Sequence, residues 1–196
     1  MNEHGDVLRV VTQRRITEQP VLETFSIVSS QEVTSLGRLE LTLPVPEDLM
    51  SVRFDGTRAY VVTFERTVGD PLFTVDLTDP ANPIQVGELD IPGWLHHMVP
   101  RGDRLVALGL DPGHPDGDLT VSLFDVSDLA LPTLLARVNF GSSLGLAEQN
   151  RVHKAFSVVD SAGLILMPFE THYPGTGYVP LVAATPEALE EQIRGF

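Results

Sequence analysis

The sequence predicts an all-β fold, a partial β-propeller of about three to four four-stranded antiparallel blades with a short C-terminal helix. The first reason is a unit of two apolar strands joined by a polar turn, which recurs around Phe25, Phe73 and Phe124. The second is that a further pair of apolar strands follows each unit, beginning at Leu49, Leu95 and Val152. Four short strands that recur with a period of roughly 50 residues are typical of blade arrays.

The repeats also predict the boundaries of the blades within a single domain, residues 1–196. Phe25 and Phe73 are 48 residues apart, whereas His96 and His153 are 57 apart, so the later spacing is stretched. The predicted blades cover approximately residues 1–43, 48–92, 94–140 and 150–184, with innermost strands near Met50–Phe54, Leu95–Val99 and Val152–Phe156. We expect the first blade to be incomplete, because residues 1–12 supply one strand with no innermost strand before it.

Three strands of the predicted blades are apolar almost continuously: Ala59–Val62, Leu105–Leu108 and Leu164–Met167. A strand covered on one face alternates, so a continuous run indicates burial on both faces. Parallel α/β sheets give the same pattern, but they need crossover helices, and no connection here has a helical period long enough to supply one. The predicted core therefore includes Val61, Phe73, Leu105, Val106, Phe124 and Ile165.

The turns favour hairpins. Asp55-Gly56 and Gly102-Asp103 lie between strands, where positive φ angles are useful. The repeated Asp76-x-x-Asp79 and Asp125-x-x-Asp128 are typical of side chains that accept backbone N–H bonds within a turn. Catalysis by these aspartates is the alternative, but recurrence at equivalent positions favours the structural interpretation.

One segment departs from the strand pattern. Thr185 is an N-cap residue, Pro186 takes the first helical position, Glu187 lies in the first turn, and Gly195 is a stop signal. These signals predict a short helix over residues 185–195, either covering a blade edge or forming a solvated tail.

Composition excludes several classes of function. The formal charge of −14 repels phosphate groups, which argues against nucleic acid or an anionic membrane as the main partner. The sequence has no cysteine, and no apolar run is long enough for a transmembrane helix. The N-terminal residues lack the basic start and apolar region of a secretory signal.

The predicted blades are too few for a closed ring. A propeller has about 4 to 8 blades, and an open array leaves unpaired strand edges at both ends. We therefore expect either further blades on a longer chain or self-association of this one.

Four segments carry a family resemblance: NEHGDVLRVVT, SVRFDGTRAYVVTFERTVGDPLFTVDLTDPANPIQVGELDIPG, VSLFDVSD and VHKAFSVVD. Together they resemble the bacterial and archaeal secreted proteins with a C-terminal β-propeller domain distantly related to WD repeats. The resemblance runs from about Asn2 to Phe169 and is most specific from Ser51 to Gly93. It implies a propeller fold and a secreted or cell-envelope parent protein, but no established activity. Members of that family are usually longer and carry an export signal.

The first candidate for chemistry is a nucleophile elbow. Gly141-Ser142-Ser143-Leu144-Gly145 fits the pattern G-x-S-x-G, and His153 lies ten residues beyond Ser143. That motif needs a strand before it and a substantial helix after it. The residues that follow leave room for only one or two helical turns, so the same residues can equally form a linker rich in glycine and serine.

Histidines form the second candidate. His96 and His153 occupy equivalent positions at the start of innermost strands, where a propeller lines its central channel. With Arg53, His97 and Lys154 nearby, neutral imidazoles there could hold a metal or an anionic ligand. The alternative is that each histidine forms a hydrogen bond with a neighbouring blade, and no metal-ligand spacing such as H-E-x-x-H is present.

The third candidate is a loop with three carboxylates: Asp111, Asp116 and Asp118. Calcium prefers such oxygen ligands, but the spacing is not that of an EF-hand loop. A solvated hairpin is the alternative, and the sequence predicts no other cofactor.

Two functions remain open. The first is a non-catalytic module that binds a protein, a glycan or a small ligand at its loops or channel mouth. The second is an enzyme, hydrolase-like or metal-dependent, that uses His96 and His153 in the channel. The sequence offers no convincing nucleophile, metal cluster or cofactor loop, which favours the first.

Overall fold

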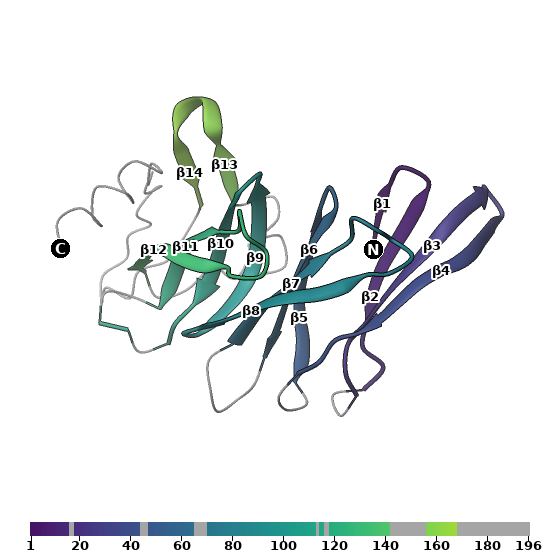
Figure 1. Cartoon of the computed structure of the whole chain (residues 1–196). Coiled ribbons are helices and arrows are strands. Elements are labelled where there is room, and N and C mark those ends of the chain that lie inside the picture. The colour runs from purple at the N-terminus through teal and green to yellow at the C-terminus, as the bar shows by residue number, and fades with distance from the viewer. Residues whose placement is uncertain are drawn as a thin grey trace. The chain divides into compact units, whose positions relative to one another are not determined.

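The computed structural model describes residues 1–15, 18–43, 47–64, 70–112, 114–115, 118–141 and 156–167. Within these residues the chain forms three antiparallel sheets of four strands and one of two strands (Figure 1). In each four-stranded sheet the strands lie side by side in sequence order. The predicted all-β fold of four-stranded antiparallel units is therefore confirmed. The predicted helix, residues 185–195, lies outside the described residues.

The first sheet consists of β1 (Asn2–His4), β2 (Val7–Thr12), β3 (Val21–Ser29) and β4 (Glu32–Glu40). Strand β1 pairs with β2, and Gly5 joins them with a φ of 58°. The expectation that the first unit lacks an innermost strand is therefore wrong. Residues Asn2–His4 form this strand, although three polar residues carry no apolar pattern from which to predict it.

The second sheet consists of β5 (Asp48–Asp55), β6 (Arg58–Phe64), β7 (Asp70–Asp76) and β8 (Ile84–Ile91). The third consists of β9 (Trp94–Arg101), β10 (Arg104–Leu110), β11 (Leu119–Asp125) and β12 (Thr133–Phe140). The predicted innermost strands near Met50–Phe54 and Leu95–Val99 lie within β5 and β9, each at one edge of its sheet. Both segments are therefore edge strands as predicted, and their place at the centre of a propeller stays a prediction.

The two-stranded sheet is a hairpin of β13 (Ser157–Val159) and β14 (Leu164–Leu166). A 3-10 turn, Asp160–Ala162, links the strands, and Gly163 ends it with a φ of 60°. Of the innermost strand predicted over Val152–Phe156, only Phe156 is described, and it lies just before β13.

The chain divides into two compact units. The first contains Met1–Pro92 and Val126–Pro132, and the second contains Gly93–Asp125 and Thr133–Phe196. The loop between β11 and β12 thus belongs to the first unit, although the two strands belong to the second.

The core of the first unit is an apolar cluster to which the first and second sheets both contribute. Its fully buried members include Leu22 from β3, Val61 from β6 and Phe73 from β7. Because Val61 and Phe73 are opposite each other in the β6–β7 register, the two strands present one continuous apolar surface. Removing this surface from water is the main source of stability for packed sheets.

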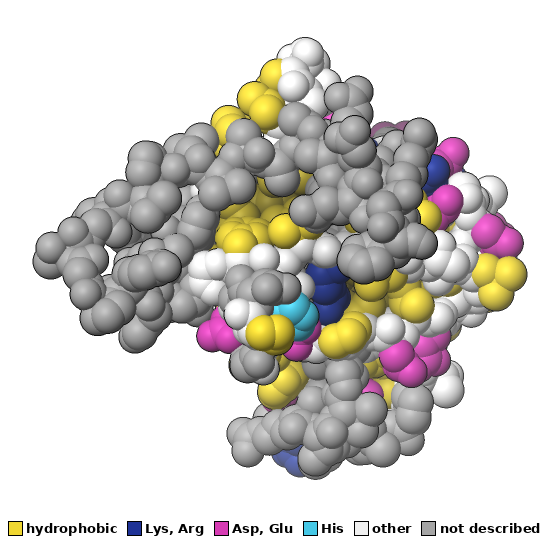
Figure 2. All heavy atoms as spheres, turned by 90° about the vertical axis from the view of Figure 1, so that its left-hand side faces the viewer, with side chains coloured by type: hydrophobic (Ala, Val, Ile, Leu, Met, Phe, Trp, Pro, Cys, Tyr) yellow, Lys and Arg dark blue, Asp and Glu magenta, His cyan; other side chains and the backbone are white. Residues whose placement is uncertain are grey.

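The core of the second unit combines β10, β11 and the hairpin β13–β14 around Phe156 and Met167. All six residues predicted as core are at most 5% exposed, namely Val61, Phe73, Leu105, Val106, Phe124 and Ile165. Some apolar side chains remain at the surface. Figure 2 shows hydrophobic side chains gathered on the face that lies to the left in Figure 1.

A β-bulge recurs between the third and fourth strands of the three large sheets. The register shifts between Thr24 and Phe25, between Thr74 and Val75, and between Leu123 and Phe124. One residue of the fourth strand is therefore extra in each sheet: Leu36, Val86 and Leu135. Bulges of this kind fix register and bend an edge strand. They also align the three sheets residue by residue.

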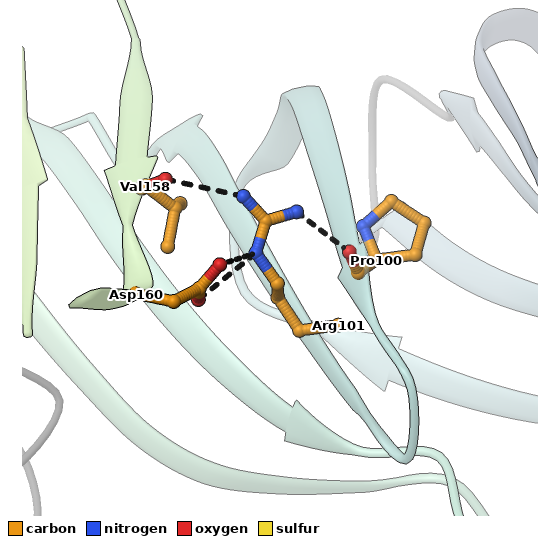
Figure 3. Close-up of polar contacts among 4 residues, drawn as sticks. All are labelled: Pro100, Arg101, Val158 and Asp160. Atoms are coloured by element: carbon orange, nitrogen blue, oxygen red, sulfur yellow. Dashed lines mark hydrogen bonds and ion pairs between the residues drawn. The ribbon is translucent and has the colours of Figure 1, made fainter.

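Within the second unit, Arg101 connects β9 to the hairpin β13–β14 (Figure 3). Its Nε lies 2.9 Å from Asp160 Oδ2, and its Nη2 donates a hydrogen bond to the carbonyl oxygen of Val158 at 3.2 Å. Its Nη1 donates to the carbonyl oxygen of Pro100 at 2.9 Å, which holds the guanidinium in place.

We expect Arg101→Ala to free the hairpin locally and to lower global stability by only about 0.5 kcal/mol, because exposed ion pairs contribute little. Amide hydrogen exchange should accelerate over Ser157–Leu166 and change little in β11. Arg104→Ala is the matched control, since Arg104 pairs at 2.9 Å with Asp125 inside the third sheet. Equal effects of the two variants on the hairpin would contradict the assignment.

Candidate functional site

The two aspartate turns have the structure that the sequence predicted. Asp76 Oδ1 accepts the N–H of Thr78 at 2.8 Å, and Asp79 Oδ1 accepts the N–H of Ala81 at 2.9 Å. In the second turn, Asp128 Oδ1 accepts the N–H of Ala130 at 2.9 Å. Hydrogen bonds from Thr78, first from its side chain and then from its backbone N–H, hold the pKa of Asp76 below its usual range. The aspartates therefore shape the turns, as the structural interpretation held.

A backbone carbonyl group of each turn lies between a threonine and a glycine on a sheet of the first unit. Thr24 donates its hydroxyl to the carbonyl oxygen of Pro80, and Thr74 donates to that of Leu129. Opposite each threonine in the sheet register is a glycine, Gly37 or Gly87.

The glycines leave room for the inserted carbonyls. A Cβ atom on Gly37 would lie 2.4 Å from the oxygen of Pro80, and one on Gly87 would lie 2.1 Å from the oxygen of Leu129. Both distances are far below van der Waals contact, and both neighbours are backbone atoms. The threonine hydroxyl therefore donates a hydrogen bond to the same carbonyl oxygen for which the glycine leaves room. We call this arrangement a Thr–Gly socket.

The third sheet has no such socket. The bulge alignment places Leu123 at the threonine position and Ala136 at the glycine position. Both are buried in the apolar cluster of the second unit, and neither side chain can donate a hydrogen bond. The socket therefore occurs in two of the three four-stranded sheets.

Sequence reasoning missed the sockets, although a signal was present. Thr24 and Gly37 are 13 residues apart, and Thr74 and Gly87 are also 13 apart. Threonine and glycine are each common in β proteins, so the pair could be recognised as a site only when the sheet register placed its two members opposite each other.

An open groove of about 500 Å³ follows β8, the strand at the outer edge of the second sheet. The groove belongs entirely to the first unit, and its walls combine apolar and polar groups: Leu39, Thr42, Pro83, Ile84, Gln85, Val86, Gly87, Glu88 and Ala130. Gln85 fixes one wall, because its amide donates to the carbonyl of Thr42 at 3.1 Å and accepts the N–H of Thr42 at 2.8 Å.

The lining of the groove includes an exposed apolar residue, Ile84, and one carboxylate, Glu88. Ile84 is 55% exposed there. Partial burial raises the pKa of Glu88 above its usual range, and the nearby charge of Asp90 raises it further. Ile84 and Glu88 were not predicted as site residues, because the groove forms only where β4 and β8 come together.

The predicted histidines have different environments. His97 is 6% exposed, and its ring meets that of Phe156 edge-on, with centroids 5.8 Å apart. His96, on the other face of β9, accepts a hydrogen bond on Nε2 from the indole of Trp94 at 2.8 Å. His97 thus has the environment of a packing residue, whereas His96 is held by its neighbour in the same strand.

The other predicted channel residues are Arg53, His153 and Lys154. Arg53, on β5, donates to the carbonyl of Val52 at 3.1 Å, and burial lowers its pKa. His153 and Lys154 lie outside the described residues, as does Ser143 of the G-x-S-x-G pattern. A common cavity for His96 and His153 remains a prediction.

The carboxylates proposed for calcium are described in part. Asp111 Oδ2 lies 3.9 Å from Arg137 Nη1, and the N–H of Asp111 donates to the carbonyl of Asp118 at 2.7 Å. Asp116 lies outside the described residues. Among the residues that are described, no three of histidine, cysteine, aspartate or glutamate are grouped so that they could hold a metal ion.

His96 predicts a pH dependence of folding. Burial lowers its pKa below the ordinary value of about 6.5, and the Trp94 bond uses the lone pair that a proton would take. In the window between the two pKa values, the unfolded chain binds the proton and the folded chain does not. Stability should therefore fall as the pH drops from about 7 through this window and then level off.

His96→Gln should remove that part of the pH dependence, as urea unfolding at a series of pH values would show. The protein contains one tryptophan, so the fluorescence of Trp94 follows the titration of His96 directly. An apparent pKa at or above about 6.5 would contradict the prediction.

The chain is similar to known sequences over nearly its whole length. Residues 1–191 match the family described as Beta propeller domain. The chain belongs to this β-propeller family. The confirmed four-stranded antiparallel sheets agree with that assignment.

Two curated relatives, both uncharacterized, come from archaea. The chain is 32% identical over 168 residues to a protein of Archaeoglobus fulgidus, which covers 86% of this chain and 25% of that protein. It is 38% identical over 136 residues to the protein MJ1554 of Methanocaldococcus jannaschii, which covers 67% of this chain and 21% of that protein. The matched region of this β-propeller chain therefore spans about a quarter or a fifth of the length of these relatives.

Within the part of the chain that the structure describes, no helix is long and apolar enough to cross a membrane.

Proposed function

We propose that this β-propeller chain is a non-catalytic interaction module within a larger exported protein. In this proposal it binds a protein, a glycan or a small ligand along the outer edge of its second sheet. The observation that carries it is the groove of about 500 Å³ along β8, a size within the range of about 300 to 1,000 Å³ that ligand sites occupy. Export is inferred from the resemblance to secreted propeller proteins.

The groove has the features of a binding surface. The Gln85–Thr42 bonds hold its walls together before any ligand arrives, so less ordering is needed on binding. Ile84 offers apolar area that a partner would remove from water. Glu88 and Asp90 add negative charge on the same strand, which favours a partner with a cationic group.

The edge of β8 offers a second kind of contact. Within the described part of the chain, β8 pairs with β7 on one side only. Edge strands can bind an extended segment through backbone hydrogen bonds, although the bulge at Val86 limits the length over which a regular strand could pair.

The test is a binding screen of the purified chain against peptide, glycan and small-ligand libraries, with hits mapped by chemical-shift changes. Ile84→Gln should weaken a groove ligand about 10-fold, since burying an isoleucine contributes about 1.5 to 3 kcal/mol. Met50→Gln is the control, because Met50 is also exposed, at 42%, but does not line the groove. Binding unaffected by Ile84→Gln would reject the groove as the site.

An esterase and glycosidase screen with metal analysis tests the alternative, an enzyme that uses His96 and His153. Turnover that is lost in His96→Ala, while the unfolding transition is kept, would overturn the non-catalytic proposal. Loss of turnover together with loss of folding would not support the alternative, so His96→Gln serves as the second variant.

A further inference from the structure

The outer hairpin of the first sheet has the same pattern as the two turns that fill Thr–Gly sockets. The two inserted turns read DLTDPANP over residues 76–83 and DVSDLALP over residues 125–132. The equivalent residues 26–33 of the first sheet read SIVSSQEV, with serine at both aspartate positions. We propose that this hairpin, Ser26–Val33, is an insertion turn that docks into a Thr–Gly socket on a further four-stranded sheet.

The tip of the hairpin has one of the bonds that shape an inserted turn, although strands β3 and β4 continue closer to this tip than β7 and β8 do to theirs. Ser29 Oγ accepts the N–H of Gln31 at 3.3 Å, in the place of the bond from Asp79 to Ala81. Serine makes this turn bond more weakly than aspartate does, but in the same position. The carbonyl of Ser30 then corresponds to those of Pro80 and Leu129, which accept the socket threonines.

Exposure distinguishes this hairpin from the two docked turns. Pro83 and Pro132, which close the docked turns, are both buried. Val33 occupies the same position in the pattern and is 50% exposed. The apolar side chain at this position is therefore covered in both docked turns and uncovered in the hairpin. A socket would cover this side chain.

The order of the docked turns indicates where the partner sheet lies in the chain. The turn after β7 inserts into the first sheet, and the turn after β11 inserts into the second. Each turn therefore occupies the sheet that precedes its own, and both sockets found among the described residues are filled. By the same rule, the socket for Ser26–Val33 belongs to a sheet encoded before Asn2. The inference rests on the proposed function in taking the chain as part of a larger protein, as relatives four to five times the length of the matched region suggest.

The sequence of that sheet follows from the spacing. Thr24 and Thr74 are 50 residues apart, and so are Gly37 and Gly87. The reading frame upstream should therefore encode a threonine or serine about 50 residues before Thr24, followed by a glycine 13 residues later. Leucine and alanine at these two positions, as in the third sheet, would overturn the inference.

The contact itself is tested by thiol labelling in the full-length protein. This chain has no cysteine, so Val33→Cys adds one reporter thiol, and Leu131→Cys, at a position that is 72% exposed, is the control. In the chain of residues 1–196, both thiols should react with maleimide at similar rates. In the full-length protein, Val33→Cys should react at least about 10-fold more slowly than the control, as buried sites do.

Replacing the upstream socket threonine with valine should restore fast labelling of Val33→Cys. Equal labelling of the two thiols in the full-length protein would overturn the inference, and so would a reading frame that begins at Met1. Protection that depends on protein concentration would assign the hairpin to a second copy and would also overturn it. None of these outcomes affects ligand binding at the β8 groove, so the proposed function is tested separately.

Discussion

Gly87→Ala is expected to lower the free energy of unfolding by about 3 kcal/mol, as overpacking against a rigid neighbour does. The added carbon would lie 2.1 Å from the carbonyl oxygen of Leu129 and 2.7 Å from the hydroxyl of Thr74. A flexible side chain could move away, but the Leu129 oxygen belongs to a backbone turn that Asp128 holds in shape. The turn must therefore leave its socket, and the hydrogen bond from Thr74 is lost with it.

Urea unfolding followed by circular dichroism measures this effect. Gly56→Asn is the control: Gly56 has a φ of 51°, which asparagine tolerates, and a Cβ there would meet no atom within 4 Å. We expect the control to cost less than about 1 kcal/mol. Equal losses in the two variants would mean that the socket contributes no more than an ordinary turn.

The sequence predicted the large sheets well because their signal is local. Ala59–Val62 lies in a strand that pairs on both sides, with β5 and β7, and its residues are buried on both faces. A continuous apolar run reports such burial directly. The aspartate turns were predictable for a similar reason, since Asp79 bonds to a backbone group only two residues away.

The parts that could not be predicted depend on residues that carry no pattern of their own. Strand β1, Asn2–His4, is short and polar, and it is fixed by pairing with β2. The one local sign of the β1–β2 hairpin in the sequence was a glycine, Gly5, at the turn position where φ is positive.

The candidate sites depend still more on tertiary structure. Thr24 contacts Pro80, which is 56 residues away in the chain, and Thr42 contacts Gln85, 43 residues away. No property of Gln85 alone distinguishes it from a solvated glutamine. Histidines attracted attention because their chemistry is versatile, but His97 is enclosed by packing and His96 is bonded to Trp94.

The two units join their own parts by different kinds of contact. In the first unit, each socket holds the carbonyl of its inserted turn through a threonine hydroxyl and leaves space for it at a glycine. Both sockets therefore require a carbonyl group in one position and direction. In the second unit, Leu123 and Ala136 contribute apolar packing instead, and Arg101 supplies the polar contact to the hairpin β13–β14. Apolar packing tolerates more variation in its partner than a buried hydrogen bond does.

Phe73→Ala is expected to lower the free energy of unfolding by about 4 kcal/mol, within the range found when buried phenylalanines are truncated. The side chain is fully buried in the cluster formed by the first and second sheets, opposite Val61. Truncation removes apolar contacts on both sheets and leaves a cavity that the paired strands β6, β7 and β8 cannot collapse to fill.

Urea unfolding measures this loss, and Leu134→Ala serves as its control, because Leu134 is 38% exposed on the edge strand β12. The control should cost less than about 1 kcal/mol. If Phe73→Ala also cost less than about 1 kcal/mol, the apolar runs would not form the core between the sheets. Because Phe73 belongs to the first unit, the variant should leave the Trp94 fluorescence of the native protein unchanged, which separates loss of stability from a change in native structure.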